Sequence, residues 1–232
     1  MNSKSLVKDI WLSNNLGLNS YYINGYLKPL PSSVQFCYSK TKTDDIDSIS
    51  KLISFGFNLI ETNIQLSIES SRLKFNHHDC RFALPKDKEC VKKIAYESFQ
   101  HSRFFKDPMI SNKKASLLKS SWAENYFNGG RGDWMIVLEI SNKVVGFLQL
   151  IRGKEGSLVI DLIAVKNDFQ GRGLAKNMIY YAVEKCLTKS TLIKVGTQLS
   201  NIESLKFYNT LGFNINSSYF ISHYHIPRNE NK

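Results

Sequence analysis

The chain has 232 residues, of which 42% are hydrophobic and 12% aromatic, enough for a packed core in one large domain or two small ones. No apolar run reaches the roughly 18 residues of a membrane helix, and the first residues lack the apolar stretch of a secretory signal. The sequence therefore predicts a cytoplasmic protein that does not enter a membrane. Its four cysteines form no C-x-x-C pair and complete no zinc pattern, so we expect reduced thiols and no metal.

The net charge of +11 favours acidic partners such as nucleic acid or phosphorylated small molecules. The lysines and arginines are spread along the chain rather than massed in one block. This spacing disfavours nucleic acid and is compatible with a small-molecule site that holds several phosphates. A general effect on solubility is the alternative.

Two regions are expected, an N-terminal α/β region over residues 1–80 and a larger region over residues 81–232. In the first, helical spacing of apolar residues covers 44–55, Gly56 is suited to a left-handed helix end, and alternation over 58–68 predicts a strand. In the second, helices are expected over 87–99, 112–126, 174–187 and 201–211, and strands over 134–140, 144–151, 157–165, 193–198 and 215–226. This order predicts an α/β fold with a mixed, mostly antiparallel sheet flanked by helices.

The most informative segment is residues 161–178, in which an apolar strand enters a glycine-containing turn that opens a helix. Free backbone N–H groups and the positive end of the helix dipole then face the same point, which favours an anion. The turn resembles the pyrophosphate-binding loop of the GNAT acetyltransferases, Gln/Arg-x-x-Gly-x-Gly/Ala, filled here by Gln170, Gly173 and Ala175. Asn201, Tyr208 and a following Leu-Gly-Phe complete the similarity, which covers about residues 81–226.

This resemblance implies the acyl-CoA N-acyltransferase fold and acetyl-CoA as co-substrate. The residues expected to hold acetyl-CoA are Leu162, Ile163, Ala164, Val165, Gln170, Gly171, Arg172, Gly173, Leu174, Ala175, Asn201 and Lys206. The strand would offer backbone groups to the pantetheine arm, and the loop N–H groups would hold the pyrophosphate. For Asn201 the alternative is a helix N-cap, and for Arg172 and Lys206 it is a solvated charge.

Tyr208 is the expected general acid, because a phenol near the sulfur can protonate the departing CoA thiolate. The alternative is a core tyrosine packed beside Phe207 and Leu211. Asp161 is the candidate general base, acting through water, or else a polar residue at a strand edge. Deprotonation of the amine by water alone stays open.

Residues 101–111, with Trp122 and the Gly56 to Thr62 pattern, resemble the dTDP-fucosamine acetyltransferases. The resemblance implies an acceptor amine on a nucleotide-linked amino-deoxysugar used for surface polysaccharide, with Arg103, Phe104 and Phe105 at the substrate. Packing at a helix end is the alternative for the two phenylalanines. The alternatives are an acetyltransferase with a peptide or polyamine acceptor and a non-catalytic acetyl-CoA-binding protein. The expected assembly is a homodimer.

An internal similarity also joins the two regions. Residues 52–60 resemble residues 208–216, each being a helix end, a glycine and the start of a strand. The N-terminal region is thus interpreted as a partial duplicate, with Leu52 in place of Tyr208. Chance similarity between two helix–glycine–strand units is the alternative.

Overall fold

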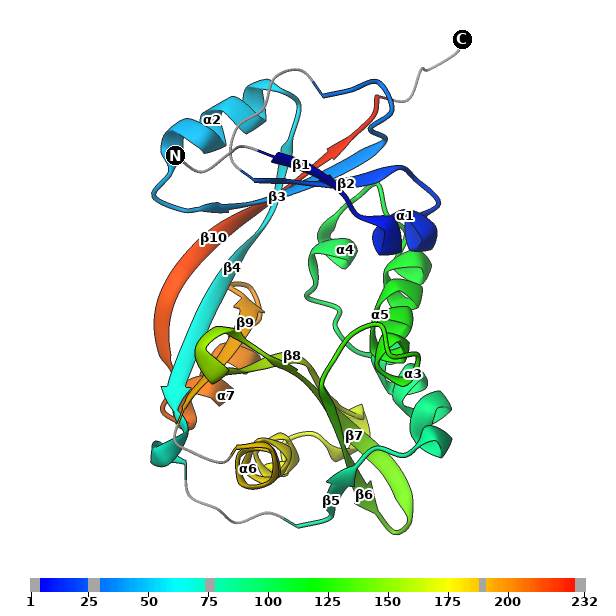
Figure 1. Cartoon of the computed structure of the whole chain (residues 1–232), viewed down its shortest axis with the longest axis vertical. Helices are drawn as coiled ribbons and strands as arrows, with labels where there is room; N and C mark the ends of the chain where they lie inside the picture. The colour runs from blue at the N-terminus through cyan, green and yellow to red at the C-terminus, as the bar shows by residue number, and fades with distance from the viewer. Residues whose placement is uncertain (1–4, 25–29, 74–77, 188–190, 228–232) are drawn as a thin grey trace.

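A computed structural model describes residues 5–24, 30–73, 78–187 and 191–227. One ten-stranded sheet, in the order β1-β2-β3-β10-β4-β9-β8-β7-β6-β5, runs through the molecule, with helices packed on it (Figure 1). The strands are β1 Ser5–Lys8, β2 Ser20–Asn24, β3 Phe36–Lys42, β4 Asn58–Glu69, β5 Cys80–Phe82, β6 Trp134–Ile140, β7 Lys143–Arg152, β8 Leu158–Val165, β9 Leu192–Gln198 and β10 Asn214–His225. The α-helices are α1 Ile10–Leu16, α2 Ile46–Ser54, α3 Lys88–Glu97, α4 Arg103–Lys106, α5 Asn112–Phe127, α6 Leu174–Cys186 and α7 Ile202–Thr210.

The expected fold class is confirmed, because only the β2–β3 and β8–β9 pairs of the described strands are parallel in an otherwise antiparallel sheet. The elements of the second region lie close to their expected bounds. The N-cap of α5 is Ser111, whose hydroxyl accepts a hydrogen bond from the backbone N–H of Lys114 at 3.3 Å. None of the described helices is long and apolar enough to span a membrane.

Two segments of the chain have the same architecture at a constant offset in sequence. The N-terminal unit, β3–α2–β4, spans Phe36–Lys42, Ile46–Ser54 and Asn58–Glu69. The C-terminal unit, β9–α7–β10, spans Leu192–Gln198, Ile202–Thr210 and Asn214–His225, so each bound is displaced by the same amount as Phe36 is from Leu192. Both helices begin at an Asx N-cap and end near a glycine of positive φ. The agreement in length, caps and turns supports the interpretation of a duplication.

The two units exchange their last strands. β4 lies between β9 and β10, whereas β10 lies between β4 and β3. The register follows the same relation: Tyr219 pairs with Lys42, and their counterparts in the opposite units, Asn63 and Gln198, also pair with each other. The sheet is therefore built around an approximate two-fold axis between β4 and β10. The division at residue 80 stays a prediction, because both regions contribute strands to one sheet.

The glycine loop and its helix have no counterpart among the described residues of the N-terminal half. In the C-terminal half α6 connects β8 to β9. Between β2 and β3, which correspond to that parallel pair, the described residues 30–35 contain no helix. An anion-binding helix terminus of the α6 type is therefore found only in the C-terminal half of the described chain.

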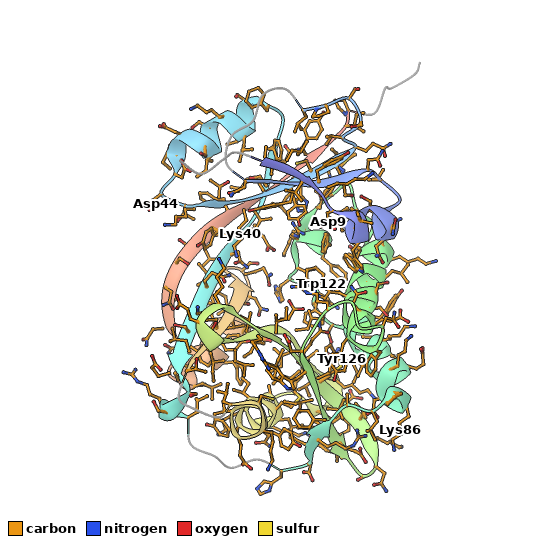
Figure 2. The ribbon with its side chains drawn as sticks, in the orientation of Figure 1. Asp9, Lys40, Asp44, Lys86, Trp122 and Tyr126 are labelled. Carbon is orange, nitrogen blue, oxygen red and sulfur yellow. The ribbon has the colours of Figure 1, made fainter. Side chains whose placement is uncertain are left out.

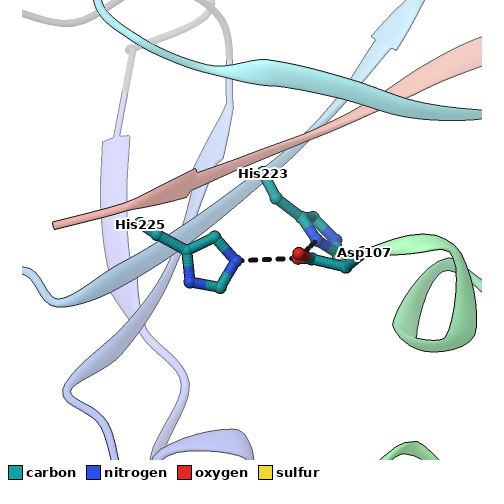
Figure 3. Close-up of side chains that lie close together, drawn as sticks. All are labelled: Asp107, His223 and His225. Carbon is teal, nitrogen blue, oxygen red and sulfur yellow. Dashed lines mark hydrogen bonds and ion pairs between the residues drawn. The ribbon is translucent and has the colours of Figure 1, made fainter. Parts of the chain in front are cut away.

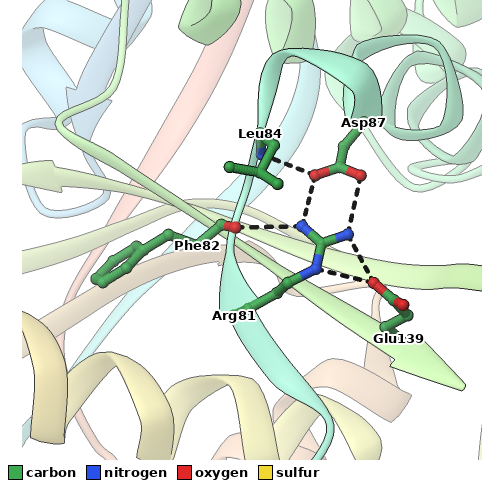
Figure 4. Close-up of polar contacts among 5 residues, drawn as sticks. All are labelled: Arg81, Phe82, Leu84, Asp87 and Glu139. Carbon is green, nitrogen blue, oxygen red and sulfur yellow. Dashed lines mark hydrogen bonds and ion pairs between the residues drawn. The ribbon is translucent and has the colours of Figure 1, made fainter. Parts of the chain in front are cut away.

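The core of the C-terminal half has two layers, one on each face of the sheet. Ile136 and Leu138 of β6 pack against α6, and the alternate residues Met135 and Val137 pack with α3 and α5 on the other face. Arg81 fixes the edge strand β5 to this core. Its guanidinium donates to both carboxylate oxygens of Asp87, at 2.7 and 3.0 Å, and to Glu139 at 2.8 Å (Figure 4).

A second polar cluster fastens the segment after α4 to the end of β10. Oδ2 of Asp107 contacts Nδ1 of His223 at 2.6 Å and Nε2 of His225 at 2.7 Å (Figure 3). His223 is fully buried and packs edge-on against Phe36, with ring centroids 4.9 Å apart. Because Asp107 follows Arg103 by one helical turn, this cluster fixes the position of α4 relative to β10 and the neighbouring β3.

Candidate active site

The site begins where β8 and β9 separate. The two strands pair only over Leu158–Ile160 and Ile193–Val195; beyond these residues β8 stays paired with β7 and β9 with β4. A cleft of about 480 Å³ opens between them. Leu162, Ile163, Ala164 and Val165, the residues expected to contact pantetheine, all line it. Backbone groups of β8 on this side have no neighbouring strand to pair with among the described residues, so an amide-bearing chain can add to the edge.

The glycine loop lies at one end of the cleft. The Gln170 amide donates to the carbonyl of Val165 at 2.8 Å, which closes the turn after β8. Gly171 and Gly173 have φ of +74° and +72°, and no heavy atom outside the adjoining chain lies within 4 Å of a Cβ built on either. Gly173 is the N-cap residue of α6. The helix N-terminus is thus open to an anion at the place where the sequence predicted one.

The loop residues differ in what their side chains do. Gln170 and Ala175 line the cleft, and Leu174 begins α6. Arg172 folds back on the loop: its guanidinium donates to the carbonyl of Asp168 at 2.9 Å and lies over the Phe169 ring. The loop is therefore suited to bind through backbone N–H groups rather than through Arg172.

Asn201 and Lys206 differ in their position relative to the cleft. Asn201 lines the cleft and also caps α7, since its Oδ1 accepts from the backbone N–H of Ser204 at 3.1 Å. Lys206 is exposed on α7 and does not line the cleft. The structure thus brings Asn201, but not Lys206, to the position expected for a cofactor contact.

Tyr208 is buried in the wall of the cleft. Its ring packs edge-on against Phe207 and Phe213, with centroid distances of 5.1 and 5.2 Å. Burial raises the pKa of Tyr208 well above its usual value, so the phenol keeps its proton at neutral pH. Core packing and access to the cleft therefore coexist at this residue, and a protonated donor lies in the cleft wall.

Asp161 lies at a bulge in β8, since Gln149 and Leu150 of β7 pair with Leu162 and Ile160. Its carboxylate lines the cleft and accepts four hydrogen bonds. Two come from Arg131 at 2.7 and 2.8 Å, one from the Trp122 indole at 2.9 Å and one from Gln149 at 3.0 Å. A carboxylate so fully engaged is better suited to position its neighbours than to accept a proton.

The three residues expected at the substrate lie on α4, outside the cleft lining. The Arg103 guanidinium stands over the Tyr38 ring, 4.0 Å from its centroid. Phe104 is buried, and Phe105 packs against the same core with Leu118. The structure thus gives both phenylalanines packing contacts, whereas the Arg103 guanidinium stands over Tyr38 and is hydrogen-bonded to it.

Two residues near the cleft, Glu61 and Lys119, were not predicted from the sequence. Glu61 on β4 accepts a hydrogen bond from Gln198 of the cleft lining at 3.4 Å, and its second oxygen is buried with no hydrogen-bond partner in the described chain. Burial raises the pKa of Glu61 to about 7, although Gln198, Arg103 and Lys119 oppose this. A signal existed, because Glu61 lies within the Gly56 to Thr62 pattern.

Lys119 lines the cleft from α5. Its ammonium lies 4.8 Å from the Trp122 ring centroid and 5.1 Å from that of Phe99. Burial, followed by the charge of Arg103, lowers the pKa of Lys119 to about 8. In sequence it is one of several lysines on an amphipathic helix, and nothing in the spacing distinguishes it.

Among the described residues, the group with metal-ligand chemistry is Asp107, His223 and His225, whose ligand-type atoms lie within 4.8 Å of one another. Hydrogen bonds from both imidazoles to one oxygen account for this closeness. Burial lowers the pKa of His223 to about 4, so this imidazole is neutral at physiological pH. Burial alone would raise the pKa of Asp107, but the bonds from the two histidines hold it well below its usual range. The cluster is therefore a carboxylate held between two imidazoles.

A glycine loop that opens a helix, beside two strands that separate, is an arrangement suited to an extended phosphate-bearing molecule such as an acyl-CoA. The family model described as the acetyltransferase (GNAT) family matches residues 94–213, more than half of the chain. The chain therefore belongs to the GNAT acetyltransferase family, as the sequence predicted. This family generally uses acetyl-CoA.

Relatives agree with this assignment. The chain is 34% identical over 143 residues to the spore coat polysaccharide biosynthesis protein SpsD of Bacillus subtilis, a match that covers 61% of this chain but only 48% of that relative. It is 24% identical to a dTDP-fucosamine acetyltransferase of Escherichia coli, with 81% and 79% of the two chains covered.

Among solved structures, a functionally unknown conserved protein from Staphylococcus epidermidis superposes with a TM-score of 0.64 at 12% identity, covering 90% of this chain and 85% of that one. A tandem GNAT protein from the clavulanic acid biosynthesis pathway superposes with a TM-score of 0.60 at 10% identity, covering 92% and 77%. At these identities the likeness concerns the fold alone. The coverage shows that the fold shared with these proteins includes the N-terminal unit.

Proposed function

We propose that this protein is an acetyl-CoA-dependent N-acetyltransferase whose acceptor is the amine of a nucleotide-linked amino-deoxysugar, of the dTDP-4-amino-4,6-dideoxyhexose type. One observation supports this reaction above the others. The glycine loop, the unpaired edge of β8 and Tyr208 all lie at one cleft. The acceptor is supported by the names of two relatives, one from polysaccharide biosynthesis and one a dTDP-fucosamine acetyltransferase. The proposal includes a cytoplasmic location and a homodimer.

In the proposed reaction, N–H groups of residues 170–175 hold the pyrophosphate and β8 holds the pantetheine arm, which directs the thioester toward Tyr208. The neutral amine attacks the thioester carbonyl, forming the C–N bond. Collapse of the tetrahedral intermediate breaks the C–S bond, and Tyr208 donates its proton to the CoA sulfur. The amine's surplus proton passes through a water to Glu61, whose raised pKa of about 7 suits a base at neutral pH.

In this scheme Asp161 keeps Arg131 and Trp122 in place. That role differs from the one proposed for Glu61, because the Glu61 carboxylate keeps an oxygen without a hydrogen-bond partner among the described residues. Water bridging is consistent with Glu61 lying beside Gln198, which lines the cleft, rather than in the lining itself.

The test is release of free CoA thiol from acetyl-CoA with a panel of dTDP-, UDP- and GDP-linked amino sugars, peptides and polyamines. Turnover with a nucleotide amino sugar, and an N-acetylated product by mass spectrometry, is the expected result. Release with peptides or polyamines alone would refute the sugar acceptor. Binding of acetyl-CoA without release for any amine would refute the enzyme in favour of a binding protein.

A further inference from the structure

Three basic side chains converge near Glu61 from three separate elements. Lys40 lies on β3, Arg103 on α4 and Lys119 on α5. The charge of Glu61 raises the pKa of all three groups, and the charge of Arg103 lowers the pKa of both lysines. Among the ion pairs between described residues, none includes Lys40, Arg103 or Lys119. Glu61 is the carboxyl group common to all three; Asp161, which is paired with Arg131, also acts on Lys119, and Asp9 also acts on Arg103.

Strand register places part of this cluster on the cleft side of the sheet. Lys40 pairs with Ile221, and Ile221 pairs with Glu61, so these side chains lie on one face. Asn63, two residues beyond Glu61 and on that same face, pairs with Gln198 of the cleft lining. The face that carries Lys40 is therefore continuous with the face on which the cleft opens.

The helices complete the surroundings of the cluster. Arg103 covers the Tyr38 ring, and Lys119 lies against Trp122 in the cleft wall. Figure 2 shows Lys40 and Trp122 on opposite sides of the region between β3 and α5. The basic groups therefore lie among aromatic faces, an environment suited to an anion attached to a ring system.

The electrostatics of the cluster favour an incoming anion. Burial, and then the charge of Arg103, lowers the pKa of Lys40, and the same causes lower that of Lys119 to about 8. Glu61, with a pKa of about 7, carries only part of a negative charge at neutral pH and leaves the basic groups in excess. Half-buried cations without a full counter-charge are costly, and a bound polyanion removes that cost.

The duplication gives Lys40 a counterpart in the C-terminal unit. When the two units are aligned bound for bound, Lys40 of β3 corresponds to Gly196 of β9, which lines the cleft of the C-terminal unit. The N-terminal unit thus carries an ammonium group where its counterpart has a glycine covered by the Gln65 side chain. The described part of its β2–β3 connection also has no helix for a pyrophosphate.

We propose that Lys40, Arg103 and Lys119 form an anion subsite that takes the diphosphate of the acceptor and so selects nucleotide-linked sugars over free amines. This inference rests on the proposed function. With the diphosphate at these cations, the attached sugar lies beside Glu61, and its amine can face the thioester near Tyr208. Lys40 of the subsite comes from the N-terminal unit, and Arg103 and Lys119 come from helices outside both units.

The subsite is tested by titrating dTDP into the protein saturated with CoA, which occupies the glycine loop in the proposed function. The expected result is saturable binding that is weakened about tenfold or more in Lys40→Met and in Lys119→Met, the loss of one charge-assisted contact. Lys113→Met on the exposed side of α5 is the matched control and should bind as the unchanged protein does. Lys119→Arg should restore most of the affinity.

A second readout separates binding from a structural or tuning effect. An anion beside Lys119 raises the lysine pKa, so dTDP binding near pH 8 should take up protons, seen as a dependence of the calorimetric enthalpy on buffer. The uptake should fall in Lys119→Met. The subsite is overturned if dTDP does not bind the CoA-loaded protein, or if both Met variants bind it as tightly as the unchanged protein. The thiol-release assay with the panel of amines tests the proposed function independently, because it measures turnover and not nucleotide affinity.

Discussion

The side-chain amide of Gln198 on β9 donates to Oε1 of Glu61 on β4 at 3.4 Å. This contact joins the strand that ends in the cleft to a strand from the other unit of the duplication. Because the units exchange β4 and β10, Glu61 lies beside a cleft whose glycine loop begins only at Gln170. The proposed base and the proposed acid, Tyr208, therefore come from different units.

Replacing Glu61 with Gln should remove the base and keep the shape. We expect kcat/KM to fall about 10²-fold or more, with acetyl-CoA affinity unchanged. In the unchanged protein kcat/KM should rise with pH and level off above about 7, since the active form is the ionised carboxylate. Rates measured across the range from acidic to mildly alkaline pH check both statements. An identical acidic limb in the variant would assign that limb to another group.

Tyr208→Phe should keep the packing against Phe207 and Phe213 and lose the proton donor. We expect turnover to fall about 10²-fold or more while the affinity for acetyl-CoA stays the same. Steady-state rates and calorimetric titration with acetyl-CoA measure the two quantities. Full turnover in Tyr208→Phe would leave this tyrosine with its packing role alone.

Gly173→Ala should weaken acetyl-CoA binding, because a methyl group enters the space above the loop and φ of +72° disfavours a side chain. Gly129 is a matched control, since its φ is +70° and an added Cβ also meets no atom within 4 Å, yet it lies in the turn after α5. Both alanine variants should lose about 1 kcal/mol of stability. Only Gly173→Ala should raise the KM for acetyl-CoA.

Asp161→Asn should separate positioning from base catalysis. The asparagine keeps one oxygen acceptor but loses the charge that pairs with Arg131. We expect a loss of less than about tenfold in kcat, less than removal of a general base causes, and an unchanged pH profile. Unfolding by urea should show a loss of about 1–3 kcal/mol, because the pair is partly buried. A rate loss as large as that of Glu61→Gln would instead make Asp161 the base.

The Asp107 cluster should make stability depend on pH. The folded state holds the pKa of His223 at about 4, below the ordinary value of 6.5, so the unfolded chain binds more protons in between. The free energy of unfolding should therefore fall as pH drops through this interval, by up to about 3 kcal/mol from this group. Below that range, protonation of Asp107 removes more. His223→Asn, compared by urea unfolding at neutral pH and near the lower end of the interval, should show a smaller difference.

Local signals predicted the C-terminal half well. Asn201 caps α7, Gly212 has the positive φ expected after a helix, and β6 and β8 lie close to their expected bounds. Residues 1–40 carry no such signal. β3 explains why: Ser39 and Thr41 are buried on one of its faces and hydrogen-bond to each other at 2.8 Å, so hydropathy does not mark the strand.

The site was predicted in part for a related reason. Residues that act through a local motif, such as Gln170 and Gly173, can be recognised from spacing. Glu61 lies beside the cleft through the pairing of β4 with β9, and Lys119 lines the cleft through the packing of α5. Such long-range placement leaves no periodic pattern in the sequence, and the bulge in β8 beside Asp161 leaves none either.

The exchange of β4 and β10 also sets an order of events during synthesis. β4 ends at Glu69, but its partners β9 and β10 begin at Leu192 and Asn214. A growing chain must therefore hold β4 without its neighbours until both of these strands have left the ribosome. Pairing across such separations is slow and exposes strand edges meanwhile. β10, the last of the described strands to be made, also pairs with β3, so the N-terminal unit stays unfinished until the C-terminal unit is complete.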